Sequence, residues 1–447
     1  MTSSPKPAGR KPTGRRTRAG LVGLVAAVII LAPRLAPAPP RVVPQEYRAL
    51  YAKLNACLFS LHRTIDGAWD HSLHEGLVPM ASVLTANSNA GPALLTPESR
   101  DATRQFIGRL RELGCRGLQL DIQFPVLDPD FYAFAKARGL MPLGDPEAED
   151  YLLFYKSVVR DIRGQGLKVS VESQVIFTQA EWSPLPVGPY YSAFDADGQA
   201  GLSRYIQRKK AMIKTIASEL APDYLTVCDE PETEMDLTGI ELLRDASRYL
   251  DMVAELTAAA RLAGPAGLKV GNGFCSWSSR WSFWVDELLR LGNDFLNVHV
   301  YPLDLSPALD SGAIIGRILE AADRARAAGR SLALGEAWLY KMRAGETDPV
   351  VIYGRDYFDF WQPLDVRFLS LMLKIAHFKR FEYVSPFWSL FFYSYLTYAE
   401  AKDMSLPERR RLNNFRAIQN IAAGMTTDTG SAYGRMITKG PAAAPMR

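Results

Sequence analysis

Two glutamates at the ends of apolar segments could act as a catalytic pair. Glu230 follows residues 224–228 within Cys-Asp-Glu-Pro, and Glu336 follows residues 331–334 within Leu-Gly-Glu-Ala-Trp. A lone carboxyl group directly after an apolar strand is costly to bury unless it has a partner or a use. Two carboxyl groups about 5–5.5 Å apart can cleave an acetal, one as proton donor and the other as nucleophile, whereas a wider spacing suits attack by water. Repulsion between such close charges raises one pKa, so one group can keep its proton.

Further polar and aromatic side chains follow strand-like segments and would surround this pair. His299 and Tyr301 lie two residues apart near the end of residues 295–301, so they share one face of a strand. Asp229 directly precedes Glu230. Aromatic rings pack well against the apolar faces of pyranose rings. Three tryptophans at strand ends are therefore candidate sugar platforms: Trp277, Trp338 and Trp388.

Eight short apolar segments alternate with segments that have helical spacing. The predicted strands are residues 77–84, 117–123, 167–171, 224–228, 268–271, 295–301, 331–334 and 383–388. The predicted helices are residues 97–113, 147–164, 202–220, 238–263, 281–291, 311–328 and 366–378. Such alternation predicts an α/β fold with parallel strands, and eight units in about 350 residues match a (β/α)8 TIM barrel. A doubly wound sheet is the alternative, but the sequence has no G-x-G-x-x-G motif and no P-loop.

The residues at these strand ends resemble those of glycoside hydrolase clan A, a group of retaining (β/α)8-barrel glycosidases. That clan places its acid/base glutamate after the fourth strand, commonly in Asn-Glu-Pro, and its nucleophile after the seventh. The resemblance implies that Glu230 is the acid/base and Glu336 the nucleophile. It also implies that Tyr301 contacts the nucleophile, that His299 and Asp229 bind sugar hydroxyls, that Trp388 supports the sugar ring, and that no cofactor is needed.

The chain departs from the clan at two strand ends. Asp229 stands where the clan usually has Asn, and an ionised Asp can only accept hydrogen bonds. Residues 121–123 (Asp-Ile-Gln) replace the arginine that many clan members carry after the second strand, and residues 172–174 (Glu-Ser-Gln) end the third. These differences leave open a carbohydrate-binding barrel without activity. A transglycosylase that remodels a surface glycan would use the same residues.

Long segments after predicted strands two, three and seven would frame the site. They cover about residues 125–146, 174–200 and 339–365, as judged from the gaps between predicted elements. Four tyrosines lie in the last two: Tyr190, Tyr191, Tyr353 and Tyr357. Such segments could build an open cleft or a closed pocket, so the sequence does not distinguish endo from exo action.

The first 41 residues have the composition of an export signal. Residues 1–18 are polar and basic, residues 19–32 are apolar, and a small-x-small site follows at residues 36–38. Fourteen residues are short for a membrane span, which needs about 20. Because Pro39 follows the candidate cleavage point, an uncleaved membrane tether through residues 19–32 is the alternative. We expect a periplasmic or extracellular protein.

The rest of the chain is predicted to form one unit. Residues 42–423 would form the catalytic barrel with a helical N-terminal lead-in, and residues 424–447 a flexible C-terminal tail rich in small residues. After the signal, 44 basic side chains face 48 acidic ones, which argues against nucleic acid as a partner. A carbohydrate is the expected partner, and the oligomeric state is not predicted.

No metal site is predicted. His71, His74 and Glu75 lie close together in the sequence, but no further metal ligand that would complete a site with them can be identified. Residues 195–198 lack the final glutamate of a calcium loop. The four cysteines include no C-x-x-C pair, so they give no support for a zinc or redox site. Export would permit a disulfide among them. These cysteines are Cys57, Cys115, Cys228 and Cys275.

Overall fold

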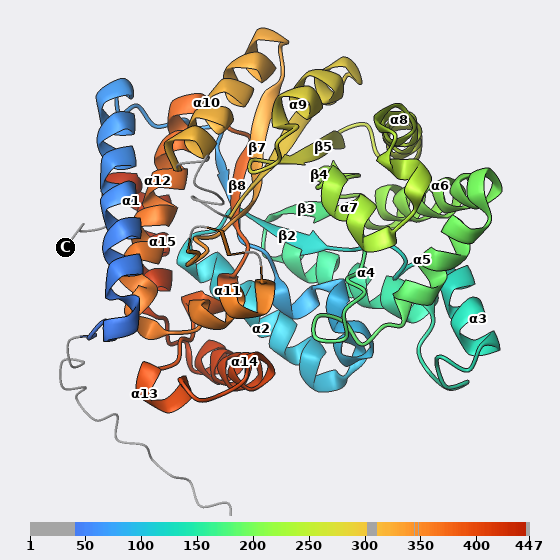
Figure 1. Ribbon diagram of the computed structural model, residues 1–447, viewed down its shortest axis with the longest axis horizontal. Helices are drawn as coiled ribbons and strands as arrows, with labels where there is room; N and C mark the ends of the chain where they lie inside the picture. The colour runs from blue at the N-terminus through green and yellow to red at the C-terminus, as the bar shows by residue number, and fades with distance from the viewer. Residues whose placement is uncertain (1–40, 302–310, 344, 347, 444–447) are drawn as a thin grey trace, which may run out of the picture. The chain divides into compact units, whose positions relative to one another are not determined.

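A closed ring of parallel strands forms the centre of the molecule (Figure 1). The computed structural model describes residues 41–301, 311–343, 345, 346 and 348–443. Eight strands neighbour one another in the order β1-β8-β7-β6-β5-β4-β3-β2, and every pair is parallel. Backbone hydrogen bonds between the segments of β1 and β2 close the ring, from the Arg116 amide to Pro79 O (2.8 Å) and from the Val83 amide to Gln119 O (2.9 Å). The predicted (β/α)8 barrel is therefore confirmed.

The strands coincide with the eight predicted segments. They are β1 (Val78–Pro79), β2 (Gly117–Asp121), β3 (Lys168–Glu172), β4 (Tyr224–Thr226), β5 (Lys269–Cys275), β6 (Phe295–Val300), β7 (Ser331–Ala337) and β8 (Tyr383–Pro386). Their apolar runs are nearly continuous because helices cover the outside and side chains fill the inside. At the amino ends Tyr224, Phe295 and Tyr383 fill the interior, with ring centroids 5.1–5.9 Å apart.

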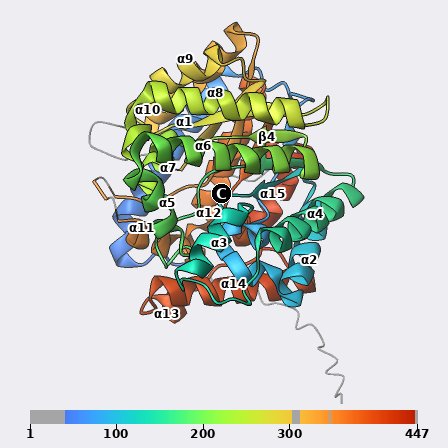
Figure 2. The same cartoon turned by 90° about the vertical axis from the view of Figure 1, so that its right-hand side faces the viewer.

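Helices surround the ring, as two perpendicular views show (Figures 1 and 2). They are α1 (Arg48–Ala68), α2 (Pro97–Leu113), α3 (Pro129–Ala137), α4 (Ala148–Gly164), α5 (Val187–Ala196), α6 (Gly198–Thr215), α7 (Pro231–Thr238), α8 (Ala246–Ala263), α9 (Trp281–Arg290), α10 (Ser311–Ala327), α11 (Pro349–Asp356), α12 (Gln362–Lys379), α13 (Tyr398–Ala401), α14 (Leu406–Ala423) and α15 (Asp428–Lys439). Helix α2 illustrates the local causes: Thr96 caps its start, and Gly114 ends it with a φ of 105°.

The predicted helical lead-in is present as α1, which packs on α12. Leu50, Leu54 and Leu58 recur at helical spacing and are buried. Lys374 on α12 also donates to the Asp66 carboxylate of α1 over 2.6 Å. The lead-in is therefore part of the barrel's outer shell.

The prediction of a flexible tail is wrong for residues 428–439, which form α15 and pack on α12 and α2. A side chain at Gly430 or Gly434 would collide with the backbone carbonyls of Phe392 and Leu113. The small residues therefore permit close packing rather than disorder. The Tyr433 hydroxyl donates to Met80 O (2.6 Å), which ties α15 to the segment that follows β1.

Within the described residues, no helix has the length and apolar character needed to cross a membrane. The predicted export segment, including the apolar run 19–32, lies outside the described residues. None of the four cysteines forms a disulfide, and three of them are buried.

Candidate active site

The two candidate glutamates lie together at the carboxyl ends of their strands. Glu336 belongs to β7, and Glu230 caps α7 directly after β4, where Pro231 at the first helical position fixes the turn. His299 Nδ1 lies 2.8 Å from Glu230 Oε1 and 3.6 Å from Glu336 Oε2. The two oxygens are thus separated by no more than the sum of these distances, 6.4 Å. One oxygen of each carboxyl group can therefore reach the same small group of substrate atoms.

A bulge in β7 aims Glu336 at this position. The pairing between β6 and β7 shifts by one residue, so that His299 faces Glu336 rather than Gly335. A side chain at Gly335 would collide with Glu172 and Asn297 inside the ring. Only glycine therefore allows both the bulge and the polar contacts beneath it.

Both glutamates have a second partner. The Tyr301 hydroxyl donates to Glu336 Oε2, and the Thr233 hydroxyl donates to Glu230 Oε2 over 2.5 Å. The side chains of Glu230 and Glu336 remain 13% and 14% exposed, whereas that of His299 is 2% exposed. The two carboxyl groups are thus oriented from below and accessible from above.

Three further carboxyl groups lie under this pair, and we call Asp121, Glu172 and Asp229 the acidic layer. Each is at most 2% exposed. Glu172 accepts a hydrogen bond from Asn297 Nδ2 (2.6 Å) and lies 3.3 Å from His299 Nε2. Asp121 Oδ1 and Asp229 Oδ1 are buried and have no hydrogen-bond partner among the described residues. All three residues lie at predicted strand ends, but only Asp229 was predicted to belong to the site.

Charges and burial set the protonation of the site. Burial alone would lower the pKa of His299. The charges of Glu336 and Glu172 outweigh burial and raise this pKa well above its usual value. Burial would raise the pKa of Glu230, but the hydrogen bond from His299 and the charge of His299 hold this pKa below its usual value. Burial and the charge of Glu172 raise the pKa of Glu336, although His299 opposes this shift. The shifts therefore favour a positive His299, an ionised Glu230 and a proton held on Glu336.

The same causes act on the acidic layer. Burial, with the charge of Glu172 second, raises the pKa of Asp121 to about 7. Burial and Glu172 also raise the pKa of Asp229 well above its usual value. The site therefore holds more carboxyl groups than it can keep ionised without a further cation.

Half-buried aromatic rings stand beside the pair. Tyr340 stacks on Tyr301 with centroids 4.5 Å apart, and its hydroxyl donates to the Tyr353 hydroxyl over 2.8 Å. The ring centroid of Tyr353 lies 5.7 Å from that of Trp388 and 4.9 Å from that of Trp182. Because Trp182 follows β3 and Tyr353 follows β7, these rings join loops from two strands that are not neighbours.

The predicted tryptophans have different positions. Trp388 belongs to this aromatic group, and Trp277 lies 5.9 Å from the Tyr301 ring. Trp338 is fully buried and packs on Phe391 and Phe392, so its predicted role as a sugar platform is wrong for this conformation. The sequence did not single out Trp182 or Tyr340 because loop residues have no periodic pattern.

One group of three described side chains has a spacing that could hold a metal ion. Ligand atoms of Glu172, His299 and Glu336 lie within 4.8 Å of one another. Both ring nitrogens of His299 already face carboxylate oxygens, which suits an imidazolium that donates from both sides. A metal would need one of these nitrogens without its proton. The contacts therefore favour a hydrogen-bonded network at this place.

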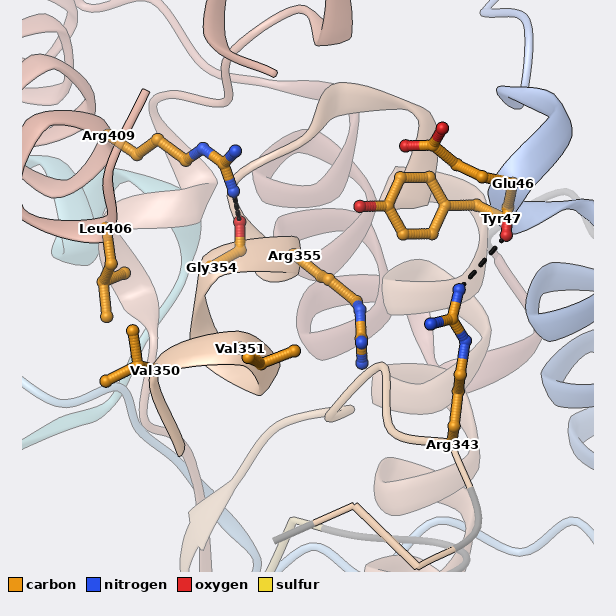
Figure 3. A pocket seen from close by; sticks show the side chains of 9 residues that line it. All are labelled: Glu46, Tyr47, Arg343, Val350, Val351, Gly354, Arg355, Leu406 and Arg409. Atoms are coloured by element: carbon orange, nitrogen blue, oxygen red, sulfur yellow. Dashed lines mark hydrogen bonds between the residues drawn. The ribbon is translucent and has the colours of Figure 1, made fainter. Parts of the chain in front are cut away.

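A pocket of about 460 Å³ lies apart from the pair and is lined by three arginines, Arg343, Arg355 and Arg409 (Figure 3). Their guanidinium groups already have partners. Arg409 donates to three backbone carbonyls, Arg355 pairs with Glu346, and Arg343 donates to Glu46 O. The arginines thus join the start of α1 to α11 and α14.

Comparisons with known proteins give fold likenesses only. No family model matches the sequence, and no curated protein matches it. The structure is similar to a family 1 β-glucosidase from Thermotoga maritima, with 10% identity, coverage of 82% of this chain and 98% of that chain, and a TM-score of 0.49. It is also similar to the exo-β-1,4-mannosidase Op5Man5 from Opitutaceae bacterium strain TAV5, with 14% identity, coverage of 76% of this chain and 60% of that chain, and a TM-score of 0.46. An endoglucanase is similar with 14% identity, coverage of 70% of this chain and 90% of that chain, and a TM-score of 0.42.

Proposed function

We propose that this chain is a retaining glycoside hydrolase that cleaves β-glycosidic bonds of a poly- or oligosaccharide. The observation that carries the proposal is the contact of Glu230 and Glu336 with one histidine nitrogen at the accessible end of the barrel. This brings the two carboxyl groups to one place, as double displacement requires, and aromatic rings that suit a sugar stand beside them.

The proposed reaction has two steps. Glu230 donates its proton to the glycosidic oxygen while Glu336 attacks the anomeric carbon, which releases the leaving group and forms a glycosyl ester on Glu336. Glu230 then takes a proton from water, and the water oxygen attacks the anomeric carbon and frees Glu336. The Tyr301 hydroxyl, which donates to Glu336 Oε2, orients the nucleophile.

This reaction requires a proton shift when the substrate binds. In the free protein the pKa of Glu336 is raised and that of Glu230 is lowered, the reverse of what the first step needs. His299 Nδ1 lies between the two carboxylates and can pass a proton from one to the other. The reactive state is thus one proton transfer away from the free state.

The test is release of reducing sugar by the purified protein from a panel of β-linked glucans, mannans, galactans, xylans and aryl β-glycosides. We expect turnover in the wild type and its loss in Glu336→Gln, since the amide cannot form the ester. Binding without turnover in both proteins would favour a silent carbohydrate-binding barrel. Products longer than the substrate would identify a transglycosylase. Turnover that survives Glu336→Gln would refute the proposed site.

Export is part of the proposal and rests on the composition of residues 1–41. Expression of the full chain followed by cell fractionation and mass determination would test it. We expect a periplasmic or extracellular protein that has lost residues before position 39, or an uncleaved protein in the membrane fraction. An uncleaved protein in the cytoplasm would contradict export.

A further inference from the structure

We infer that the sugar bound at this site carries a positive charge, as a free amino group on the pyranose ring does. The inference rests on the proposed function for the place where the sugar binds. It deepens that function by naming the substrate class as amino sugars that are not N-acetylated.

The first observation is an imbalance of charge. Five carboxyl groups share one buried region with a single imidazole, and no described lysine or arginine forms an ion pair with any of the five. The charges of Glu172 and His299 act on both Asp121 and Asp229, so the members of the group affect one another. The charge of the buried Lys209 also acts on Asp229, but Lys209 forms its ion pair with Glu234. The five are Asp121, Glu172, Asp229, Glu230 and Glu336.

The second observation is that two of these groups each have one buried oxygen without a hydrogen bond, although Asp121 accepts one from Asn87 at its other oxygen (3.2 Å). Asp229 Oδ1 and Asp121 Oδ1 are buried without a partner among the described residues, although buried polar atoms nearly always have one. Such acceptors favour a ligand rich in donors. An ammonium group offers three donors and no acceptor, whereas a hydroxyl group offers one donor.

The attraction does not require contact with every carboxyl group. Glu230 and Glu336 are the exposed members, and the acidic layer lies directly beneath them. Charges interact far more strongly in a protein interior than in water, so a cation held between the two glutamates would lower the pKa values of Asp121 and Asp229. The layer therefore loses protons as the cation binds and then attracts it. A sugar carboxylate at the same place would be repelled.

The aromatic rings favour an organic cation over a metal ion. Trp388 and Tyr353 stand beside the carboxyl groups and offer ring faces to a pyranose and to an ammonium group. Both nitrogens of His299 are already paired with carboxylates. A cationic substrate would also lower the pKa of Glu336 and so leave the nucleophile ionised, as the proposed reaction needs.

The experiment is calorimetry with sugars that differ at one substituent. Wild-type protein is titrated at about pH 6, where an amino group is protonated, with glucosamine, glucose and N-acetylglucosamine and with β-linked disaccharides of each. We expect the amino sugar to bind at least tenfold more tightly than its neutral counterparts. We expect Asp229→Asn to reduce this preference about tenfold.

Asp245→Asn is the matched control, because Asp245 is exposed at the start of α8 and the variant has the same change in net charge. It should retain the wild-type preference. Melting curves establish that both variants are folded. Equal binding of amino and neutral sugars, a preference unchanged in Asp229→Asn, or sugar binding that needs an added divalent metal would overturn the inference.

The two proposals fail in different ways. Neutral sugars that are bound and cleaved, with loss of turnover in Glu336→Gln, would refute the charged substrate and leave the hydrolase standing. Tight binding of amino sugars without turnover would support the inference and refute the hydrolase. Absence of binding by every sugar would refute both.

Discussion

Two buried charge clusters lie on one short segment of the chain, and their construction differs. Glu234 on α7 accepts hydrogen bonds from Lys209 Nζ (2.6 Å), the Tyr205 hydroxyl (2.6 Å) and the Tyr249 hydroxyl (3.0 Å). One turn earlier, Glu230 belongs to a group in which five carboxyl groups share one imidazole. The first cluster is balanced in charge, and the second is not.

The difference separates stability from activity along one helix. Removing one partner of a balanced buried pair leaves an uncompensated charge and costs about 3–5 kcal/mol. Replacing Glu230 loses its interaction with His299 but also relieves its repulsion of Glu336, so the fold should lose less. We therefore expect Glu234 to support the fold and Glu230 to support the reaction.

The largest expected effect is on catalysis, in Glu230→Gln. Turnover of glycosides with alcohol leaving groups should fall about 10²–10⁴-fold, because the leaving oxygen loses its proton donor. Aryl glycosides whose leaving group needs no proton should lose much less in the first step. Steady-state kinetics on both substrate classes measures this contrast. If Glu336→Gln showed the spared aryl activity instead, the two roles would be reversed.

The second effect is on stability, in Glu234→Gln. We expect a loss of about 3–5 kcal/mol in the free energy of unfolding, because Lys209 would be buried without its partner. Denaturant titration measures the loss, with Glu230→Gln as the comparison. The double variant Lys209→Met/Glu234→Gln should recover part of it. An equal loss in Glu230→Gln would show that the two clusters do not differ in this way.

The third effect is a pH dependence of stability caused by Asp121. Its pKa rises from 3.8 unfolded to about 7 folded, so the folded state binds the proton more tightly. The stability that this group contributes is fully present below about pH 4 and is lost as the pH rises through about 7. The resulting decrease in the free energy of unfolding is on the order of 2–4 kcal/mol. Asp121→Asn should remove this loss in melting curves at pH 5 and 8.

His299 acts in the same direction as Asp121, since its raised pKa gives stability at low pH that is lost as the pH rises. Asp245→Asn is again the control, because hydrogen bonds from Ser247 lower the pKa of Asp245. A wild-type protein that is more stable at pH 8 than at pH 5 would contradict the imbalance of charge.

The smallest effect is expected for Tyr301→Phe. This variant removes the hydroxyl that donates to Glu336 while it keeps the ring that stacks on Tyr340. A lost hydrogen bond to a charged group is worth about 1.5–3 kcal/mol, so turnover should fall about 10- to 100-fold. The ratio of kcat to KM measures it. An unchanged value would remove Tyr301 from the site.

The barrel and the two glutamates could be predicted because both depend on local patterns. An apolar strand that ends in a polar side chain is visible in one dimension, and eight repeats of strand and helix fix which ends meet. Glu230 and Glu336 were found in this way. Asp121 and Glu172 have the same pattern, but a sequence does not show how many carboxyl groups lie around one histidine in the folded protein.

Other features depend on contacts between distant parts of the chain. The pairing of β6 and β7 shifts at Gly335, where a side chain would collide with Glu172 and Asn297, and no local motif records that contact. Trp338 directly follows Glu336 and Ala337 of β7, as expected for a sugar platform, yet its ring stacks on that of Phe391. Residues 424–447 resemble a tail in composition, but Gly430 and Gly434 lie against backbone carbonyls where a side chain would collide.

The bond from Tyr433 to the carbonyl of Met80 has a consequence for how the protein is made. Strand β1 has two residues and pairs with β8, so the first strand of the ring is held by segments near the C-terminal end of the chain. A ribosome releases β1 first, and its partners β8 and α15 follow more than 300 residues later. The barrel can therefore close only when synthesis is almost complete.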